Sequence, residues 1–166
     1  ILLVANLPYQ VATPLIIELL LGELPVSPMC FTVQVEVADR FLAVPGGKDY
    51  GPVSIYTRAL ATVRRIVRVP PEAFWPVPEV HSAMLHVDVC PERRPAGAVL
   101  EQLTSIVRGC FNHRRKTMRA NLRSLLDTTS YVRVESDGRW DLTLRPELLD
   151  VDQWIALAVF LAQYAE

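Results

Sequence analysis

No part of the sequence limits the fold more than its start, where an apolar run, residues 1–5, leads directly into Asn6-Leu7-Pro8-Tyr9. The apolar run predicts a buried strand of an α/β sheet. In such sheets the carboxyl ends of parallel strands face the ligand crevice, so residues just past a strand are placed for chemistry. Pro8 has a fixed φ and restricts Leu7 to extended conformations, and the turn is therefore stiff.

The groups in this turn are suited to holding a planar exocyclic amine. The amine of adenine is a poor nucleophile because its lone pair is delocalised into the ring. Two acceptors that hold its two hydrogens favour the pyramidal geometry needed for attack, and the Asn6 Oδ1 and the Leu7 carbonyl are the candidate acceptors. Tyr9 offers a flat face for an extruded base. Four residues alone are as typical of an ordinary proline turn after a strand, so the rest of the chain must decide.

Four further segments support the first. A stiff aromatic loop, residues 74–83, contains Phe74 within Phe-Trp-Pro-Val-Pro and leads into an alternating strand. The others are residues 34–40 (QVEVADR), 45–54 (PGGKDYGPVS) and 111–122 (FNHRRKTMRANL). In order and spacing, these segments together resemble the ribosomal RNA adenine N6,N6-dimethyltransferase family, also called the dimethyladenosine transferases. The resemblance extends from Leu3 to about Leu161.

The resemblance implies an α/β fold in two parts. Residues 1–92 are expected to form the carboxyl-terminal half of a Rossmann-like class I methyltransferase domain, and residues 93–166 a small all-α domain that binds ribosomal RNA. The implied reaction is dimethylation of the N6 amine of two adjacent adenosines near the 3′ end of small-subunit (16S) ribosomal RNA during ribosome biogenesis. S-adenosylmethionine is the implied methyl donor, and the pre-30S particle is the implied partner.

The resemblance also assigns roles to residues. Asn6, Leu7 and Tyr9 occupy the catalytic positions, and Asn6 is also expected to contact the donor. Phe74 occupies the position that stacks on the target adenine. Because the donor's methyl group is already activated, catalysis is expected to rest on orientation and on the polar contacts to the amine, without a metal.

One departure from the family pattern concerns the donor site. The family has a Gly-rich turn after its first strand and then an acidic residue that holds the donor's ribose, and this sequence has neither; Gly46-Gly47 lies in a loop. The chain also begins without Met, inside a strand pattern. We therefore expect a piece of a longer enzyme that is inactive and does not bind the donor alone. The complete enzyme is expected to be a monomer, and the piece to self-associate through an exposed sheet edge.

The charge is unevenly distributed. The net charge is −1, yet residues 108–123 hold six basic residues and no acidic one, which leaves 11 basic against 18 acidic residues elsewhere, a net −7. A cluster of one sign on a near-neutral chain predicts a phosphate-binding surface, and the alternative is a solvated helix face. The candidate RNA-binding residues are Arg114, Arg115, Lys116, Arg119 and Arg123.

Composition places the protein among folded proteins of the cytoplasm. The chain is 51% hydrophobic and 21% charged, which excludes a disordered chain. No apolar stretch reaches the length of about 18 residues that a membrane helix needs, and there is no signal peptide. Scattered cysteines and histidines argue against a disulfide framework or a metal site and favour a reducing compartment. These residues are Cys30, Cys90, Cys110, His81, His86 and His113.

Periodicity and turn signals predict the elements. Strands are expected at residues 1–5, 29–35, 62–69 and 83–89, the last two as an antiparallel pair at a sheet edge. Helices are expected at residues 14–21, 36–44, 53–61, 100–111 and 114–126, with a final helix around Trp154–Leu161 and a linker at 91–95. Thr13, Pro14 and Gly22 are expected to be the N-cap, first position and stop of the first helix. Residues 131–134 are expected to form a short strand or an extended loop.

Trp75 and Trp154 are expected to anchor a loop or the core rather than to stack on bases.

Two other functions are alternatives to the family reading. A DNA adenine N6-methyltransferase shares the Asn-x-Pro-Tyr motif, although the aromatic loop and the basic segment argue against it. A non-catalytic RNA-binding or ribosome-assembly factor that keeps the fold is the other alternative.

Overall fold

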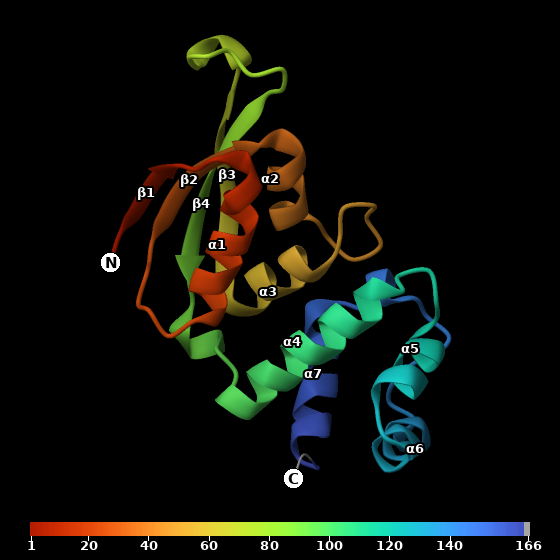
Figure 1. Cartoon of the computed structure of the whole chain (residues 1–166). Coiled ribbons are helices and arrows are strands. Elements are labelled where there is room, and N and C mark those ends of the chain that lie inside the picture. Colours follow the sequence, from red (N-terminus) through yellow and green to blue (C-terminus); the bar gives the residue numbers. More distant parts are fainter. Residues whose placement is uncertain (165–166) are drawn as a thin grey trace. The chain divides into compact units, whose positions relative to one another are not determined.

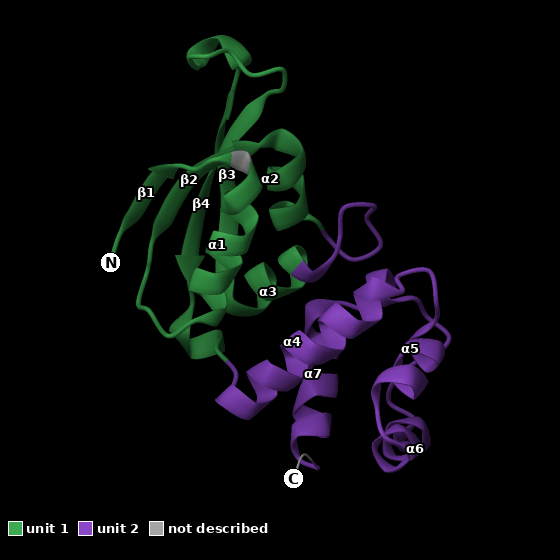
Figure 2. Ribbon diagram, in the orientation of Figure 1, with its two compact units in different colours: residues 1–43, 53–94 green, residues 44–52, 95–166 purple. Residues whose placement is uncertain are grey.

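The computed structural model describes residues 1–164, with the side chain of Tyr9 left out. The chain forms two compact units (Figure 2). The first contains residues 1–43 and 53–94, and the second contains residues 44–52 and the chain from residue 95 onward. The division after Arg94 lies two residues from the boundary expected at 92–93. The sequence did not predict that residues 44–52 join the second unit.

The first unit is built on a four-stranded mixed sheet with strand order β1-β2-β4-β3 (Figure 1). Its strands are β1 (Leu3–Asn6), β2 (Met29–Gln34), β3 (Ala61–Val69) and β4 (Ser82–Val89). β1 and β2 are parallel, with Asn6 beside Thr32. β4 runs antiparallel to both β2 and β3, which confirms the predicted pair with β3 at the sheet edge.

Helices cover one face of this sheet (Figure 1). They are α1 (Tyr9–Leu21), α2 (Val35–Leu42) and α3 (Pro52–Leu60). The buried side of the sheet includes Phe31 and Leu85, and the Phe31 ring meets the edge of the Phe41 ring of α2 at 5.8 Å between centroids. Burial of these apolar side chains is the main source of stability for the unit.

The predicted start of α1 was wrong. The helix begins at Tyr9, with Pro8 as its N-cap, and Pro14 lies inside it rather than at its first position. Proline removes a helix hydrogen bond and usually marks an end, which is why the sequence favoured a later start. The buried stripe of Ala12, Ile16 and Leu20 already begins before Pro14, and its packing stabilises the longer helix.

The regular elements described in the second unit are all helical. They are α4 (Gly97–Asn112), α5 (Met118–Leu125), α6 (Thr128–Asp137), α7 (Val151–Ala162) and a 3₁₀ turn, Pro146–Leu148. Trp154 of α7 is fully buried and lies 6.1 Å from the Phe111 ring, between ring centroids. Its predicted place in the core is therefore confirmed. No helix within residues 1–164 is long and apolar enough to cross a membrane.

Two further predictions in this unit were wrong. α5 begins at Met118 because Thr117 caps it, accepting a hydrogen bond from the Ala120 backbone N–H, so the helix predicted to begin at residue 114 starts four residues later. Residues 131–134 belong to α6 rather than to a strand or loop. Asp127 caps that helix and Gly138 ends it in the left-handed conformation, with φ 75°.

Residues 44–52, a loop that ends at the first residue of α3, are fastened to the rest of the second unit. The Gly46 N–H donates to the Glu147 carbonyl at 2.7 Å, and the buried Tyr50 hydroxyl donates to the Leu149 carbonyl at 2.9 Å. A glycine is required at position 46, where φ is 80°. We call residues 44–52 the inserted loop.

Candidate active site and nucleic-acid interface

The carboxyl end of β1 opens into a pocket of about 290 Å³. Two segments far apart in the sequence line it, the turn after β1 and the aromatic loop between β3 and β4. The lining residues are Asn6, Leu7, Pro8, Phe74, Trp75, Pro76 and Pro78. Three of the predicted site residues, Asn6, Leu7 and Phe74, therefore meet in one pocket of the first unit.

Asn6 is the last residue of β1, and its side chain is exposed and held in place. The Thr32 hydroxyl, on the neighbouring strand, donates a hydrogen bond to the Asn6 Oδ1. An amide oxygen has two lone pairs, so one acceptor position remains for a ligand. Thr32 was not among the predicted site residues. Its role depends on the strand register, which no short-range sequence pattern discloses.

The backbone of the turn supplies a second acceptor. The Pro8 carbonyl accepts hydrogen bonds from the N–H groups of Val11 and Ala12, both at 3.1 Å, and so begins α1. Among the described residues, no backbone hydrogen bond reaches the Leu7 carbonyl. Two acceptors, the Asn6 Oδ1 and the Leu7 carbonyl, are thus available at one side of the pocket. The side chain of Tyr9 lies outside the described residues.

The aromatic loop presents its two rings differently. Phe74 is half-buried and lines the pocket. Trp75 also lines the pocket, but its residue is 95% exposed. The prediction that Trp75 anchors a loop or core was therefore wrong. The loop bends at residues 74–76, and the indole lies in solvent rather than in the apolar interior.

The basic cluster of the second unit divides into different kinds of residue. Arg114 fastens the inserted loop: its Nη1 donates to the Lys48 carbonyl at 2.8 Å and its Nη2 to the Gly47 carbonyl at 3.3 Å. The Arg114 Nε also lies 3.7 Å from a carboxylate oxygen of Glu147. A guanidinium used in this way is a structural residue with few donors left for phosphate.

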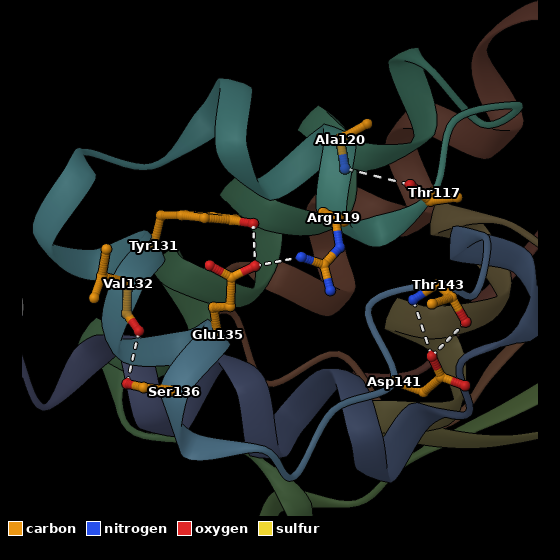
Figure 3. A network of polar contacts seen from close by, with 9 residues as sticks. All are labelled: Thr117, Arg119, Ala120, Tyr131, Val132, Glu135, Ser136, Asp141 and Thr143. Carbon is orange, nitrogen blue, oxygen red and sulfur yellow. Dashed lines mark hydrogen bonds and ion pairs between the residues drawn. The ribbon is translucent and has the colours of Figure 1, made fainter.

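Arg119 belongs to a polar network between α5 and α6 (Figure 3). Its guanidinium pairs with the Glu135 carboxylate, which also accepts a hydrogen bond from the Tyr131 hydroxyl at 2.9 Å. The pKa of the Tyr131 phenol is raised, chiefly by this hydrogen bond and also by the charge of Glu135. Arg119 is still 54% exposed at its side chain, so a phosphate can approach it.

The remaining basic residues of the cluster are exposed cations. Arg115, Lys116 and Arg123 make no ion pair or side-chain hydrogen bond within the part of the chain that is described. Arg119 and Arg123 line one open groove on α5 together with Thr117, Ala120 and Ser124. This groove, with Arg115 and Lys116 in the turn before it, is the candidate phosphate-binding surface.

A larger cavity, about 630 Å³, also lies in the second unit, but its charged groups are already engaged. Asp127 accepts hydrogen bonds from the N–H groups of Thr129 and Ser130 at 2.8 and 3.0 Å. The Arg133 guanidinium lies 4.3 Å from the centre of the Tyr164 ring. None of the predicted site residues lines this cavity.

Curated relatives resemble the chain over nearly all of its length. A protein of Idiomarina loihiensis named ribosomal RNA small subunit methyltransferase A is 38% identical over 160 residues, which covers 96% of this chain and 54% of the relative. The protein of that name from Pseudomonas aeruginosa is 39% identical and covers 96% of this chain and 58% of the relative. The chain thus spans little more than half the length of these relatives.

Solved structures show the same fold. A dimethyladenosine transferase from Plasmodium falciparum superposes with a TM-score of 0.78 at 20% identity, covering 94% of this chain and 64% of that one. The 23S rRNA methyltransferase ErmE superposes with a TM-score of 0.61 at 25% identity, covering 96% and 64%. The mixed α/β fold is therefore of the methyltransferase kind that the sequence predicted. Since the family model for ribosomal RNA adenine dimethylase matches residues 1–162, the chain belongs to the ribosomal RNA adenine dimethylase family.

Proposed function

We propose that the protein transfers methyl groups from S-adenosylmethionine to the N6 amines of two adjacent adenosines near the 3′ end of small-subunit ribosomal RNA. The observation that carries this proposal is the meeting of Asn6, Leu7 and Phe74 in one pocket. The pocket combines two hydrogen-bond acceptors with an aromatic face, as recognition of an extruded adenine requires.

The pocket suits one base. Its volume of about 290 Å³ lies just below the roughly 300–1,000 Å³ typical of ligand sites. Phe74 would stack on the adenine, while the Asn6 Oδ1 and the Leu7 carbonyl accept hydrogen bonds from its amine and orient the nitrogen lone pair. The Thr32 hydroxyl keeps the Asn6 amide in the required rotamer.

The donor would contribute an activated methyl group on a sulfonium centre. Of the described residues, Asn6 would contact it, because its amide is an exposed polar group at the carboxyl end of β1. This fit is limited to one edge of the donor. We propose that residues outside this chain hold the rest of it, and that residues 1–166 alone neither bind the donor measurably nor transfer methyl groups.

The second unit would hold the ribosomal RNA. Arg115, Lys116, Arg119 and Arg123 are exposed on or next to α5, and cations so placed neutralise phosphates without reading sequence. The pre-30S particle in the cytoplasm is the partner that we propose, bound by a monomer of the complete enzyme.

The test replaces Asn6 with Ala. Because the curated relatives extend beyond the matched region, transfer of a labelled methyl group to ribosomal RNA is measured for residues 1–166 joined to the remaining part of a relative. We expect the single-turnover rate to fall by about 10²-fold, the effect of losing one preorganised polar contact at a reacting centre. Gln10→Ala is the matched control, since Gln10 is exposed nearby but does not line the pocket. A normal rate for Asn6→Ala, or transfer to duplex DNA in preference to ribosomal RNA, would contradict the proposal.

A further inference from the structure

We propose that Trp75 is a second base-binding site, at the rim of the pocket, that stacks on an unpaired nucleotide next to the target adenosine. This inference rests on the proposed function, because it supposes that an adenosine enters the pocket beside it. It adds a ligand contact that neither the family resemblance nor the pocket chemistry requires.

The first observation is the exposure of the ring. Trp75 is 95% exposed, although a tryptophan is normally among the most buried side chains on average. No aromatic ring or guanidinium packs on it among the side chains that the structure describes, which exclude that of Tyr9. The loop that carries it, between β3 and β4, projects beyond the sheet (Figure 1). Both faces of the indole are therefore free for a ligand.

The second observation is the different burial of two neighbouring rings. Phe74 and Trp75 both line the pocket. The Phe74 side chain is half-buried there, whereas Trp75 is almost fully exposed at the open rim. The indole is thus available for a neighbouring base.

The third observation is the charge around the loop. Its charged residues, Glu72 and Glu79, are both exposed carboxylates, which repel phosphates. Arg64 and Arg68 of β3 are exposed and make no ion pair among the described residues, whereas Arg65 pairs with Asp39. The loop therefore offers contacts to base faces, and cations for the backbone are found on the strand that leads into it. Unpaired RNA is bound in this way, by aromatic stacking beside a basic surface.

The experiment measures the binding of a single-stranded oligoribonucleotide with one central adenosine to the 166-residue chain. Affinities are measured for the unchanged chain, Trp75→Ala and Trp75→Phe, with a series of oligonucleotides that each lack one base next to the adenosine. We expect Trp75→Ala to weaken binding of the intact oligonucleotide by about 5- to 100-fold, and Trp75→Phe to restore most of it. With one of the abasic oligonucleotides, Trp75→Ala should cause no further loss of affinity, because the base that the Trp75 indole contacts is already missing.

Several outcomes would overturn the inference. The inference is wrong if the unchanged chain and Trp75→Ala bind every oligonucleotide with equal affinity, or if neither binds. It is also wrong if Trp75→Ala lowers the affinity for every abasic oligonucleotide by the same factor. If Trp75→Ala changed only the sedimentation of the protein, the indole would be a protein contact instead. Because Trp75 is exposed, thermal melting should show the same folded state for all variants.

The proposed function fails by a different result. Methyl transfer is measured separately, with ribosomal RNA as acceptor. No methyl transfer would refute the proposed enzymatic function. If RNA affinity still depended on Trp75 and on the base at one position, the loop would remain a base-binding site.

Discussion

Arg114 and Arg115 are neighbours in the basic cluster, yet we expect opposite consequences from their removal. Arg114 donates hydrogen bonds to the carbonyls of Lys48 and Gly47 in the inserted loop, whereas Arg115 is exposed and unpaired among the described residues. Arg114→Ala should therefore destabilise the second unit, and Arg115→Ala should weaken RNA binding without affecting stability.

The size of the effect follows from the contacts. A hydrogen bond from a charged donor contributes roughly 1.5–3 kcal/mol. The Arg114 side chain is 37% exposed, so water replaces part of what is lost, and two bonds together should contribute only about 1.5–2 kcal/mol. For a protein of this size that corresponds to a fall in melting temperature of about 3–8 °C. Arg115→Ala should change the free energy of unfolding by less than about 0.5 kcal/mol.

Melting temperature and the salt dependence of RNA affinity are measured on the same variants. Arg114→Lys keeps the charge but not the two-pronged geometry, so it should lower the melting temperature while leaving the salt slope unchanged. Arg115→Ala should reduce the log–log slope by about 0.7 to 0.9. A stable Arg114→Ala variant with the same reduction in slope as Arg115→Ala would refute the assignment of Arg114 as a structural residue.

Two other predictions concern single groups. Thr32→Val should lower the methyl-transfer rate by up to about tenfold, the value of one hydrogen bond, with RNA affinity unchanged. In a protein that already carries Asn6→Ala, Thr32→Val should have no further effect on the rate. An equal loss of rate with and without Asn6→Ala would show that Thr32 does not act through Asn6. Cys110 is fully buried, and burial raises its pKa from 9.0 to about 12. Because the pKa of this thiol is higher in the folded than in the unfolded protein, its contribution to stability is complete below pH 9. The free energy of unfolding should therefore fall as pH rises from 9 toward 12. Cys110→Ala should remove that part of the pH dependence. At pH 8, a thiol reagent should modify Cys30 and Cys90 before Cys110; equal rates would contradict the assigned burial.

The strands were predictable because their signals are local. Alternation and apolar runs placed β2, β3 and β4 within one residue of their observed ends. The start of α1 was not predictable from Pro14, because the buried stripe that stabilises the earlier turns depends on packing against the sheet. α6 carries its own signals, Asp127 before the helix and Gly138 after it, but the β-branched and aromatic residues between them favour a strand in the sequence.

The site was predictable only in part. The resemblance assigned Asn6 and Phe74 their roles, and the structure places both at one pocket. The hydroxyl of Thr32 reaches Asn6 through strand register, and Arg114 reaches Lys48 through the folding of the inserted loop. Contacts between residues 26 and 66 positions apart are properties of the tertiary structure, which charge and spacing along the chain do not specify.

The inserted loop means that the helical unit cannot be cut out as one continuous piece of chain. Expression of the segment that follows the expected linker would omit the partners of Arg114, Glu147 and Leu149, and the buried Leu149 carbonyl would lose the Tyr50 hydroxyl. The hydroxyl of Tyr50 meets a carbonyl 99 positions later, so on the ribosome this unit must wait for Leu149 to be synthesised before it can close. Transfer of the helical unit to another protein therefore requires residues 44–52 as well.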